Sequence, residues 1–166
     1  LFQDADGKPL KFFDAVVGGR SVGTPGTPAL LAQIHAKYGN RDWASLLEPA
    51  RDLATRGFAV SPRLAQLIAA DAERLASSPI TSDYFMPAGV PVAEGTTLTN
   101  LPYARTMEVL ATQGVGAFYA GDLAKAIVAT VRGAKDSPGV LSQVDMAIYR
   151  VKERPAVCAD YRAHRV

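Results

Sequence analysis

A repeated pattern of helix starts and stops limits this chain to a mainly helical fold. In residues 27–39, Thr27 can cap a helix whose first turn holds Pro28, and Gly39 stands just past the last apolar residue. Residues 121–133 follow the same rule, with Asp122 as the expected cap and Gly133 as the stop. We therefore expect a helix in each stretch.

The region between these two helices carries further helix signals. Asp42 is expected to cap a short turn, and Pro49 to end that turn and begin a separate helix that Gly57 closes. A helix over 101–113 has Pro102 near its start and Gly114 as its stop.

Residues 61–77 predict one long helix. Ser61 is the expected N-cap and Pro62 occupies the first helical position. Apolar residues recur at helical spacing, so we expect one buried stripe. It consists of Leu64, Leu67, Ile68, Ala72 and Leu75.

Three other regions complete the expected organisation of residues 1–166 as one helical segment. Residues 1–26 form a loop-rich lead-in with one short extended or helical piece, and residues 77–99 interrupt the helices of 27–137 with an irregular excursion packed by its aromatics. Within 138–166, Ser142 and Asp145 have capping-box spacing for one helical turn, and β-prone runs follow. The fold class is therefore mainly α, with a short C-terminal β-hairpin or strand pair.

Length and charge exclude several classes of protein. A chain of 166 residues with 48% hydrophobic residues can bury a core without disulfides or metal. The net charge of +2 is spread along the chain, which argues against nucleic-acid binding, and no apolar run reaches the about 20 residues of a membrane span. Leu1 opens the chain in place of Met, so we expect a piece of a longer protein.

The stretch GGRSVGTPGTPALL, from Gly18 to Leu31, first suggests a phosphate loop. Gly18 and Gly23 have the four-residue gap of a Walker-type loop, but Thr24 and Pro25 stand where lysine and a hydroxyl residue are needed. Two interpretations remain open: a structural turn that starts a helix, or a wall of an active site.

The residue types that carry metal or nucleophilic chemistry are not clustered in the sequence. His35 is expected on a helix surface and His164 at a strand end, and Cys158 is expected to be a small strand residue packed inside. Asp71 and Glu73 are expected on a solvated helix face. The aromatic residues Phe85, Phe118 and Tyr119 are expected to be core or anchor residues. We assign no catalytic, cofactor-binding or metal-binding residue.

Several segments, in this order, resemble the γ-glutamyltranspeptidases, also called glutathione hydrolases. SVGTPGTPALLAQIHAKYG is similar to that family's Gly-Val-Pro-Gly turn and following helix, AFYAG to its Ala-Phe-Tyr-x-Gly segment, and DMAIY to its Asp-x-x-x-Tyr segment. WASLLEPARDLATRGFAVSPRLA and ADYRAHRV are similar to further stretches. Thr24, Ala163 and residues 100–103 depart from the family pattern.

The resemblance implies that this chain is an internal fragment of the large chain of an αββα N-terminal-nucleophile hydrolase. Such an enzyme is a precursor that cleaves itself, and a threonine at the new N-terminus of the smaller chain attacks γ-glutamyl amides such as glutathione. The resemblance thus implies the smaller chain as the partner and a periplasmic or secreted location. It implies no cofactor. The strands of 138–166 would enter the central sheet.

The threonines of this chain are all internal, so the resemblance transfers no catalytic residue to it. We expect an inactive scaffold with exposed apolar surface, and Gly23–Gly26 as the part nearest the cleft, through backbone shape alone. Two alternatives stay open: a related acylase or poly-γ-glutamate-processing enzyme of the same fold, or a stand-alone helical binding module.

Overall fold

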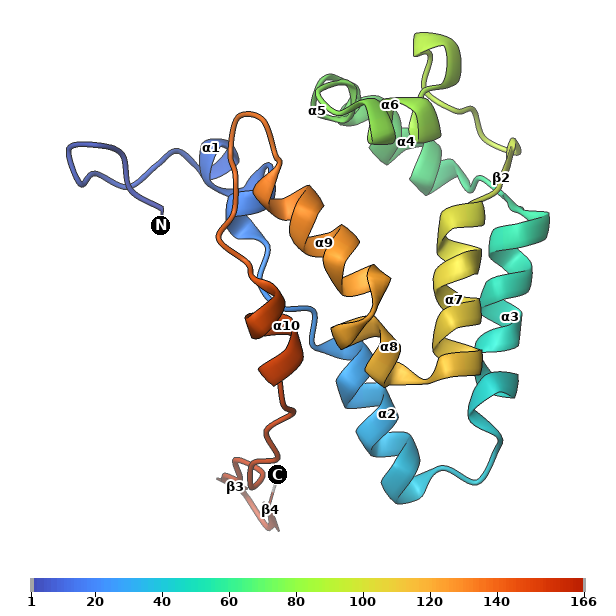
Figure 1. The fold of residues 1–166 in the computed structure, drawn as a ribbon, viewed down its shortest axis with the longest axis vertical. Helices are drawn as coiled ribbons and strands as arrows, with labels where there is room; N and C mark the ends of the chain where they lie inside the picture. Colours follow the sequence, from blue (N-terminus) through green and yellow to red (C-terminus); the bar gives the residue numbers. More distant parts are fainter. Residues whose placement is uncertain (1, 166) are drawn as a thin grey trace. The chain divides into compact units, whose positions relative to one another are not determined.

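Helices account for most of residues 2–165, the range that the computed structural model describes (Figure 1). The chain divides into two units. Unit 1 joins the residues up to Asn40 with those from Val115 onward, and unit 2 is the continuous stretch Arg41–Gly114. The described residues contain no helix long and apolar enough to cross a membrane.

Unit 1 is built around the short helix α8, which packs against α2, α9 and α10. Its elements are α1 (Phe12–Val16), the 3-10 turn η1 (Gly19–Ser21), α2 (Thr27–Tyr38), α8 (Val115–Ala120), α9 (Asp122–Arg132), α10 (Gln143–Ile148), β3 (Asp160–Tyr161) and β4 (His164–Arg165). Its buried side chains include Phe118, Val128, Val131, Leu141 and Met146. The segment that could be extended or helical is thus the helix α1.

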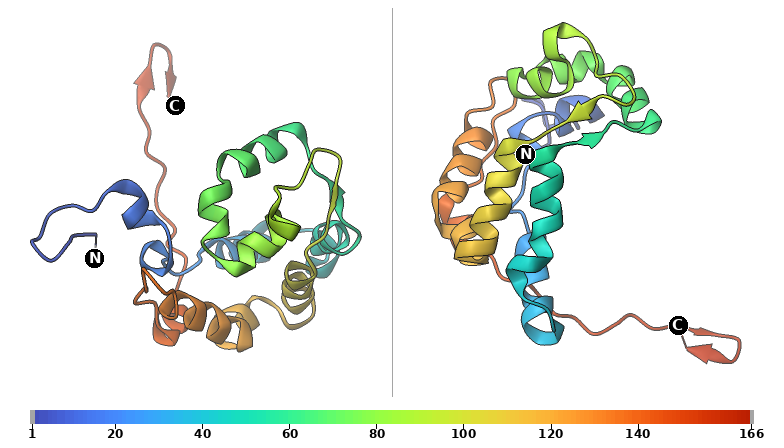
Figure 2. Two further views of the ribbon diagram at one scale, coloured as in Figure 1. Left: turned by 90° about the horizontal axis from the view of Figure 1, so that it is seen from above. Right: turned by 90° about the vertical axis from the view of Figure 1, so that its right-hand side faces the viewer.

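In unit 2, a small antiparallel sheet and a pair of packed helices bring together segments that are far apart in the sequence. Its elements are α3 (Trp43–Arg56), β1 (Phe58–Ala59), α4 (Pro62–Ala70), α5 (Ala72–Ala76), α6 (Pro79–Phe85), the 3-10 turn η2 (Pro87–Gly89), β2 (Thr97–Leu98) and α7 (Leu101–Gln113). Strands β1 and β2 are antiparallel, with Phe58 opposite Leu98 and Ala59 opposite Thr97. Beyond this pair, α3 and α7 lie side by side (Figures 1 and 2).

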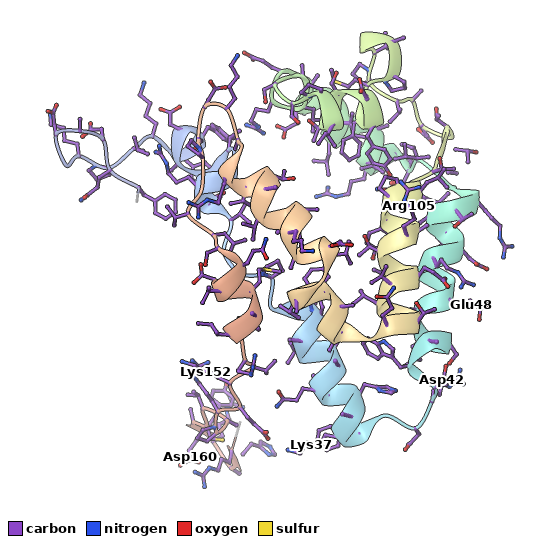
Figure 3. The ribbon with its side chains drawn as sticks, viewed as in Figure 1. Lys37, Asp42, Glu48, Arg105, Lys152 and Asp160 are labelled. Carbon is purple, nitrogen blue, oxygen red and sulfur yellow. The ribbon has the colours of Figure 1, made fainter. Side chains whose placement is uncertain are left out.

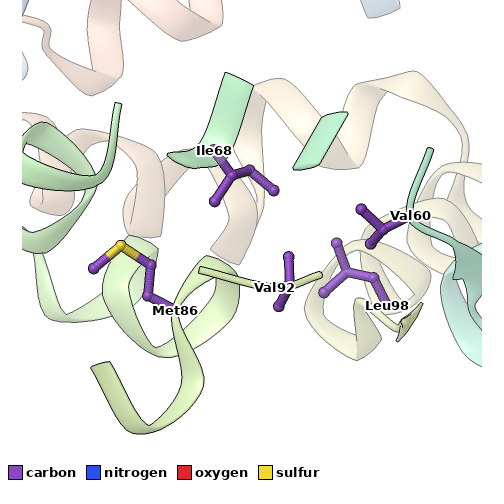
Figure 4. Close-up of a cluster of buried hydrophobic side chains, with 5 residues drawn as sticks. All are labelled: Val60, Ile68, Met86, Val92 and Leu98. Carbon is purple, nitrogen blue, oxygen red and sulfur yellow. The ribbon is translucent and has the colours of Figure 1, made fainter. Parts of the chain in front are cut away.

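One buried hydrophobic cluster of unit 2 involves α4, β2 and the segments next to them, and α3 and α7 bury further residues. Figure 4 shows the five side chains of this cluster, Val60, Ile68, Met86, Val92 and Leu98. Leu64, Ala72, Leu75 and Phe85 pack against this cluster from outside. The aromatic packing expected of the excursion is present, since Tyr84 and Phe85 meet edge to face with ring centroids 4.6 Å apart.

The glycine stops are confirmed, but two of the expected caps are wrong. Gly39, Gly57, Gly114 and Gly133 each directly follow a helix. Thr27 and Asp122, however, are the first helical residues, and the N-caps are the preceding glycines, neither of which has a side-chain cap. The Asp122 carboxylate accepts a hydrogen bond from Lys125 instead.

The expected break at Pro49 does not occur, because α3 continues through it as one helix. Asp42 caps α3 by accepting from the Ser45 N–H at 2.9 Å, as expected. Contacts to α7 fix the helix on both sides of the proline. The Trp43 indole donates to the Leu110 carbonyl at 2.8 Å, and Arg51 pairs with Glu108 at 2.9 Å. Packing along α7 therefore outweighs the hydrogen bond that proline removes.

The single helix expected over 61–77 is divided at Asp71 into α4 and α5. Ser61 caps α4 by accepting from the Leu64 N–H, as expected. At Asp71 the backbone widens to φ −107°, and its carboxylate forms an ion pair with Arg74. Leu67, expected in the buried stripe, is 51% exposed, whereas Ile68 beside it on α4 is 3% exposed.

Residues 77–99 are more regular than expected, since they contain α6, η2 and β2. Strand β2 finds its partner in β1, on the other side of α4 and α5 in the sequence. A two-residue strand has no period to detect, so local pattern gives no sign of it.

The C-terminal region forms the expected hairpin, in a smaller version. Strands β3 and β4 are antiparallel, with Asp160 opposite Arg165 and Tyr161 opposite His164. Both views in Figure 2 show this hairpin at the end of an extended segment. The expectation that Cys158 is packed inside a strand is wrong: its side chain is exposed and it lies outside both strands. The segment between α10 and β3 has no strand partner among residues 2–165.

Candidate functional site

The turn Gly23–Gly26, singled out by its sequence, leads directly into α2. A Cβ placed on Gly23 would meet nothing within 4 Å, so the backbone at that position is accessible. At the other end of the turn, Gly26 is the N-cap of α2 and supplies no side-chain acceptor. The N–H groups of a first helical turn have no partner within the helix and need acceptors from elsewhere.

Tyr119, from α8, supplies the missing acceptor. Its hydroxyl accepts a hydrogen bond from the Ala29 N–H at 3.2 Å and donates one to the Pro25 carbonyl at 2.5 Å. Pro28 has no N–H of its own, so Ala29 holds the N–H that a helix cap would normally satisfy. One phenol therefore caps α2 and fixes the turn in front of it. Tyr119 is thus the expected anchor, and Phe118 beside it the expected core residue, 9% exposed.

Tyr149, just after α10, completes this arrangement. Its ring is stacked on that of Tyr119, with centroids 5.9 Å apart and planes 8° apart. A Cβ on Gly26 would overlap the Tyr149 hydroxyl. A larger residue at position 26 would therefore require the Tyr149 side chain to shift. We call Gly26, Tyr119 and Tyr149 together the tyrosine clamp.

The environment of the Tyr119 phenol keeps it protonated. Burial raises its pKa above the ordinary value for tyrosine, the hydrogen bond from the Ala29 N–H lowers it, and the neighbouring Tyr149 raises it. The net effect is a raised pKa. At neutral pH the hydroxyl therefore keeps the proton that it donates to Pro25.

The tyrosine clamp joins three sequence segments that carry the family resemblance. Gly26 ends the Gly-Thr-Pro-Gly turn, Tyr119 belongs to Ala-Phe-Tyr-Ala-Gly, and Tyr149 ends the Asp-x-x-x-Tyr segment. Residue-by-residue reasoning did not identify Tyr149, because nothing local distinguishes it from other tyrosines. Its place in a segment shared with the family was the signal that could have found it.

At Gly18–Ser21, the first part of the suspected phosphate loop, the backbone lies directly against the backbone of another segment. The Arg20 N–H donates to the Ser137 carbonyl at 3.0 Å, and a Cβ on Gly19 would overlap the Val131 carbonyl. Glycine is needed there because two backbone segments touch. The structural interpretation therefore holds for this part of the stretch.

A shallow groove of ≈160 Å³ runs along the second half of α2, beside residues 151–153. Leu30, Ile34 and Tyr38 line it from α2. At its end, the Lys37 ammonium pairs with the Glu153 carboxylate at 2.8 Å, and this hydrogen bond raises the pKa of Lys37. Figure 3 marks Lys37 near the C-terminal end of α2. The groove is apolar and brings together no set of groups able to perform chemistry.

The histidines and acidic residues singled out in the sequence do not form a common site. His35 lies half-buried on α2 and His164 lies exposed on β4. Asp71 is engaged with Arg74, while Glu73 is exposed, as expected of a solvated face. No group of three or more metal-ligating side chains occurs within residues 2–165. That no catalytic, cofactor or metal residue belongs to this chain stays a prediction.

Comparison with known proteins agrees with these features. A family model described as gamma-glutamyltranspeptidase matches residues 1–166. A glutathione hydrolase proenzyme of Bacillus subtilis (strain 168) is 32% identical over 166 residues, covering 100% of this chain and 28% of the relative. An acylase ACY 1 proenzyme of Pseudomonas sp. (strain SE83) is 32% identical over 151 residues, covering 91% of this chain and 26% of the relative.

A solved structure shows the same fold. The gamma-glutamyltranspeptidase of Helicobacter pylori superposes with a TM-score of 0.92 at 28% identity, covering 100% of this chain and 47% of that one. The helical fold is therefore that of part of an N-terminal-nucleophile hydrolase. The chain spans under a third of the length of the curated relatives that it matches. Because the family model extends over the whole chain, the protein belongs to the gamma-glutamyltranspeptidase family.

Proposed function

We propose that this chain is the helical part of an enzyme that cleaves γ-glutamyl amides and transfers the γ-glutamyl group to water, an amino acid or a peptide. The observation that carries this proposal is the match of the family model to every residue from 1 to 166. The name glutathione hydrolase proenzyme, borne by a relative aligned over the whole chain, supports both the reaction and a self-cleaving precursor.

In the proposed reaction, the nucleophile is a threonine at the N-terminus of a second, smaller chain of the same precursor. Its free α-amine takes the proton from its own hydroxyl, the oxygen attacks the γ-glutamyl carbonyl, and the amine of the substrate leaves. Water or an acceptor amine then releases the γ-glutamyl ester. This chain contributes shape and support to that site.

Exposed apolar side chains support the role of scaffold. On α2, Leu31 is 51% exposed and Ile34 47%, and on α1 Phe12 is 70% exposed. Leu31 and Ile34 lie one helical turn apart, and adjacent exposed apolar side chains are typical of surfaces that pack against another part of a protein. We assign them to contacts with the remaining parts of the precursor, including the nucleophile-bearing chain.

An acylase of the same fold is the second candidate. The acylase proenzyme from Pseudomonas is as similar in sequence as the glutathione hydrolase from Bacillus subtilis, each at 32% identity. The two reactions use the same kind of acyl transfer on different amides. A stand-alone helical binding module, by contrast, gains no support from any of these relatives.

The test is to express the full-length precursor that contains this chain and to measure self-cleavage and amide hydrolysis. We expect two chains on a denaturing gel, a new N-terminal threonine, and release of the aniline from a γ-glutamyl anilide. Hydrolysis of a cephalosporin side chain without γ-glutamyl turnover would favour the acylase. The isolated 166-residue chain, assayed at the same concentration, should show no turnover. Release by that chain would refute the scaffold role.

A further inference from the structure

A hollow of ≈410 Å³ lies in unit 1, between α1, η1 and the loop that follows α9 (Figure 1). Three apolar side chains, Leu10, Phe13 and Val17, form part of its lining, and we call them the apolar wall. The rest of the lining is charged or polar. Apolar walls with a few polar groups, around about 300–1,000 Å³, are typical of sites for small molecules.

Backbone contacts hold the segments around the hollow together. The Arg20 N–H donates to the Ser137 carbonyl at 3.0 Å, and the Gly139 N–H donates to the Val131 carbonyl at 2.9 Å. A Cβ on Gly18 would lie only 2.8 Å from the Ser137 Cβ, so these two segments also touch through a glycine. The hollow therefore has walls that are in place before any ligand binds, which lowers the entropic cost of binding.

Three charged side chains line the hollow from three different elements. Arg20 lies half-buried on η1, and the carboxylates of Asp14, on α1, and Asp136, on the loop after α9, are exposed. Within residues 2–165, none of the three side chains forms an ion pair or a side-chain hydrogen bond. A guanidinium has five N–H donors and a carboxylate only acceptors. Opposite charges that share a hollow without pairing with each other remain available to a ligand.

Ser137 adds a buried polar group to the same lining. Its side chain is 8% exposed, and its hydroxyl has no hydrogen-bond partner in the described part of the chain. Buried hydroxyl groups in folded proteins nearly always have a partner. A polar ligand seated in the hollow would supply one.

We propose that this hollow binds a free α-amino acid with an apolar side chain. The ligand's carboxylate pairs with the Arg20 guanidinium, its ammonium pairs with Asp14 and Asp136, and its side chain contacts the apolar wall. A simple anion would face two carboxylates and a simple cation would face the guanidinium, so the charges favour a ligand that carries both. The proposal goes beyond the proposed function, because it assigns a ligand site that the acyl transfer does not use.

Isothermal titration calorimetry of the full-length precursor with L-leucine tests the proposal. Arg20→Gln should weaken binding by at least about tenfold, because it removes the charge-assisted hydrogen bonds to the ligand's carboxylate. Arg63→Gln, at an exposed position on α4 in unit 2, is the matched control and should leave the affinity unchanged. The proposal fails if the unsubstituted precursor does not bind leucine at millimolar concentration, or if the two variants bind it equally well.

Two altered ligands separate the charges. Leucinamide lacks the carboxylate and N-acetylleucine lacks the ammonium, so each should bind at least about tenfold more weakly than leucine. Asp14→Asn combined with Asp136→Asn should weaken leucine and leave N-acetylleucine nearly unaffected. An altered ligand that binds as tightly as leucine would show that the corresponding charge is not read.

Ser137→Ala separates a binding role from a structural one. The hydroxyl that it removes has no partner in residues 2–165, so the melting temperature should stay the same or rise. Leucine affinity should fall by about 3- to 10-fold. A lower melting temperature with unchanged affinity would mean that the hydroxyl serves the fold and not the ligand.

Amide hydrogen exchange, measured by mass spectrometry, locates the ligand without using activity. Leucine should slow exchange at least about threefold in peptides covering 10–20 and 134–139, and inorganic phosphate at the same concentration should not. Equal protection by phosphate would overturn the amino-acid assignment, and protection confined to other peptides would overturn the site. This readout holds whether or not the precursor shows γ-glutamyl turnover, so failure of the proposed function is distinguishable from failure of this proposal.

Discussion

Met146 is a fully buried side chain of unit 1. It lies on α10 with 0% of its side chain exposed, whereas Ile148, two residues later on the same helix, is 64% exposed. Burial, and not residue type, therefore separates these two apolar residues.

We predict that Met146→Ala lowers the free energy of unfolding by about 2–5 kcal/mol, because it removes buried methylene groups and leaves a cavity. Ile148→Ala is the matched control and should cost no more than about 0.5 kcal/mol. Urea unfolding followed by circular dichroism measures both. Similar losses in the two variants would show that α10 is not packed as described.

The helices differ in whether a side chain accepts hydrogen bonds from the N–H groups of the first turn. The α10 helix has a full capping box: the Ser142 hydroxyl accepts from the Asp145 N–H, and the Asp145 carboxylate accepts from the Ser142 N–H at 2.9 Å. The N-cap of α6 is Ser78, whose side chain makes no capping hydrogen bond. Two serines that are both N-caps therefore contribute differently to helix stability.

We predict that Ser142→Ala lowers the free energy of unfolding by about 0.5–2 kcal/mol, while Ser78→Ala changes it by less than about 0.5 kcal/mol. Thermal unfolding of the two variants under identical conditions makes the comparison. An equal effect at both serines would contradict the assignment of the capping box.

The same capping box gives stability a defined pH dependence. Hydrogen bonds from the Ser142 hydroxyl, and then from its N–H, lower the pKa of Asp145. A carboxylate whose pKa is lower in the folded state than in the unfolded state stabilises the folded protein at pH values above the unfolded pKa of about 3.9. This contribution to stability is lost as the pH falls through the folded pKa. The original chain should therefore lose more stability between pH 7 and about pH 3 than Ser142→Ala does.

The α3 helix tolerates a proline that its own sequence disfavours. Pro49 lies inside the helix, between Trp43 and Arg51, whose contacts to α7 hold it in place. Pro102 instead lies at the start of α7, where a missing N–H costs nothing.

Pro49→Ala should raise the free energy of unfolding by about 1–3 kcal/mol, because it restores a helical hydrogen bond and removes a steric clash. Pro102→Ala is the control and should stay within about 0.5 kcal/mol. Chemical denaturation measures both. A loss of stability in Pro49→Ala would mean that the proline ring itself packs usefully.

Apolar exposure is a property of the whole molecule and bears on its association. Leu31, Ile34 and Tyr38 on α2 are 51%, 47% and 67% exposed. Large apolar areas left open to water favour association with other protein surfaces. This exposure agrees with the expectation of uncovered apolar surface.

We predict that the 166-residue chain self-associates as its concentration rises, measured by light scattering. Replacing Leu31 and Ile34 by glutamate should shift it toward the monomer, while Ala36→Glu, at an exposed position on the same helix, should not. A monomer at all concentrations would rule out association through this face.

Local sequence predicted much of the fold because most helix boundaries depend on short-range contacts. Ser61, Asp42 and the four glycine stops satisfy or end the backbone hydrogen bonds of their own helices, so a window of a few residues contains the cause. Pro49 was misjudged for the opposite reason, since what preserves α3 is its contact with α7.

The sequence by itself determined the helical class, the stops, the capping box and, through its ordered motifs, the family. The tertiary structure decided that Gly26, Tyr119 and Tyr149 meet in one clamp, that β1 finds β2, and that Cys158 is exposed. The physical reason is range. Caps and periodicity act within a helical turn, whereas a hydrogen bond across 90 residues exists only after the helices that carry its two ends have packed.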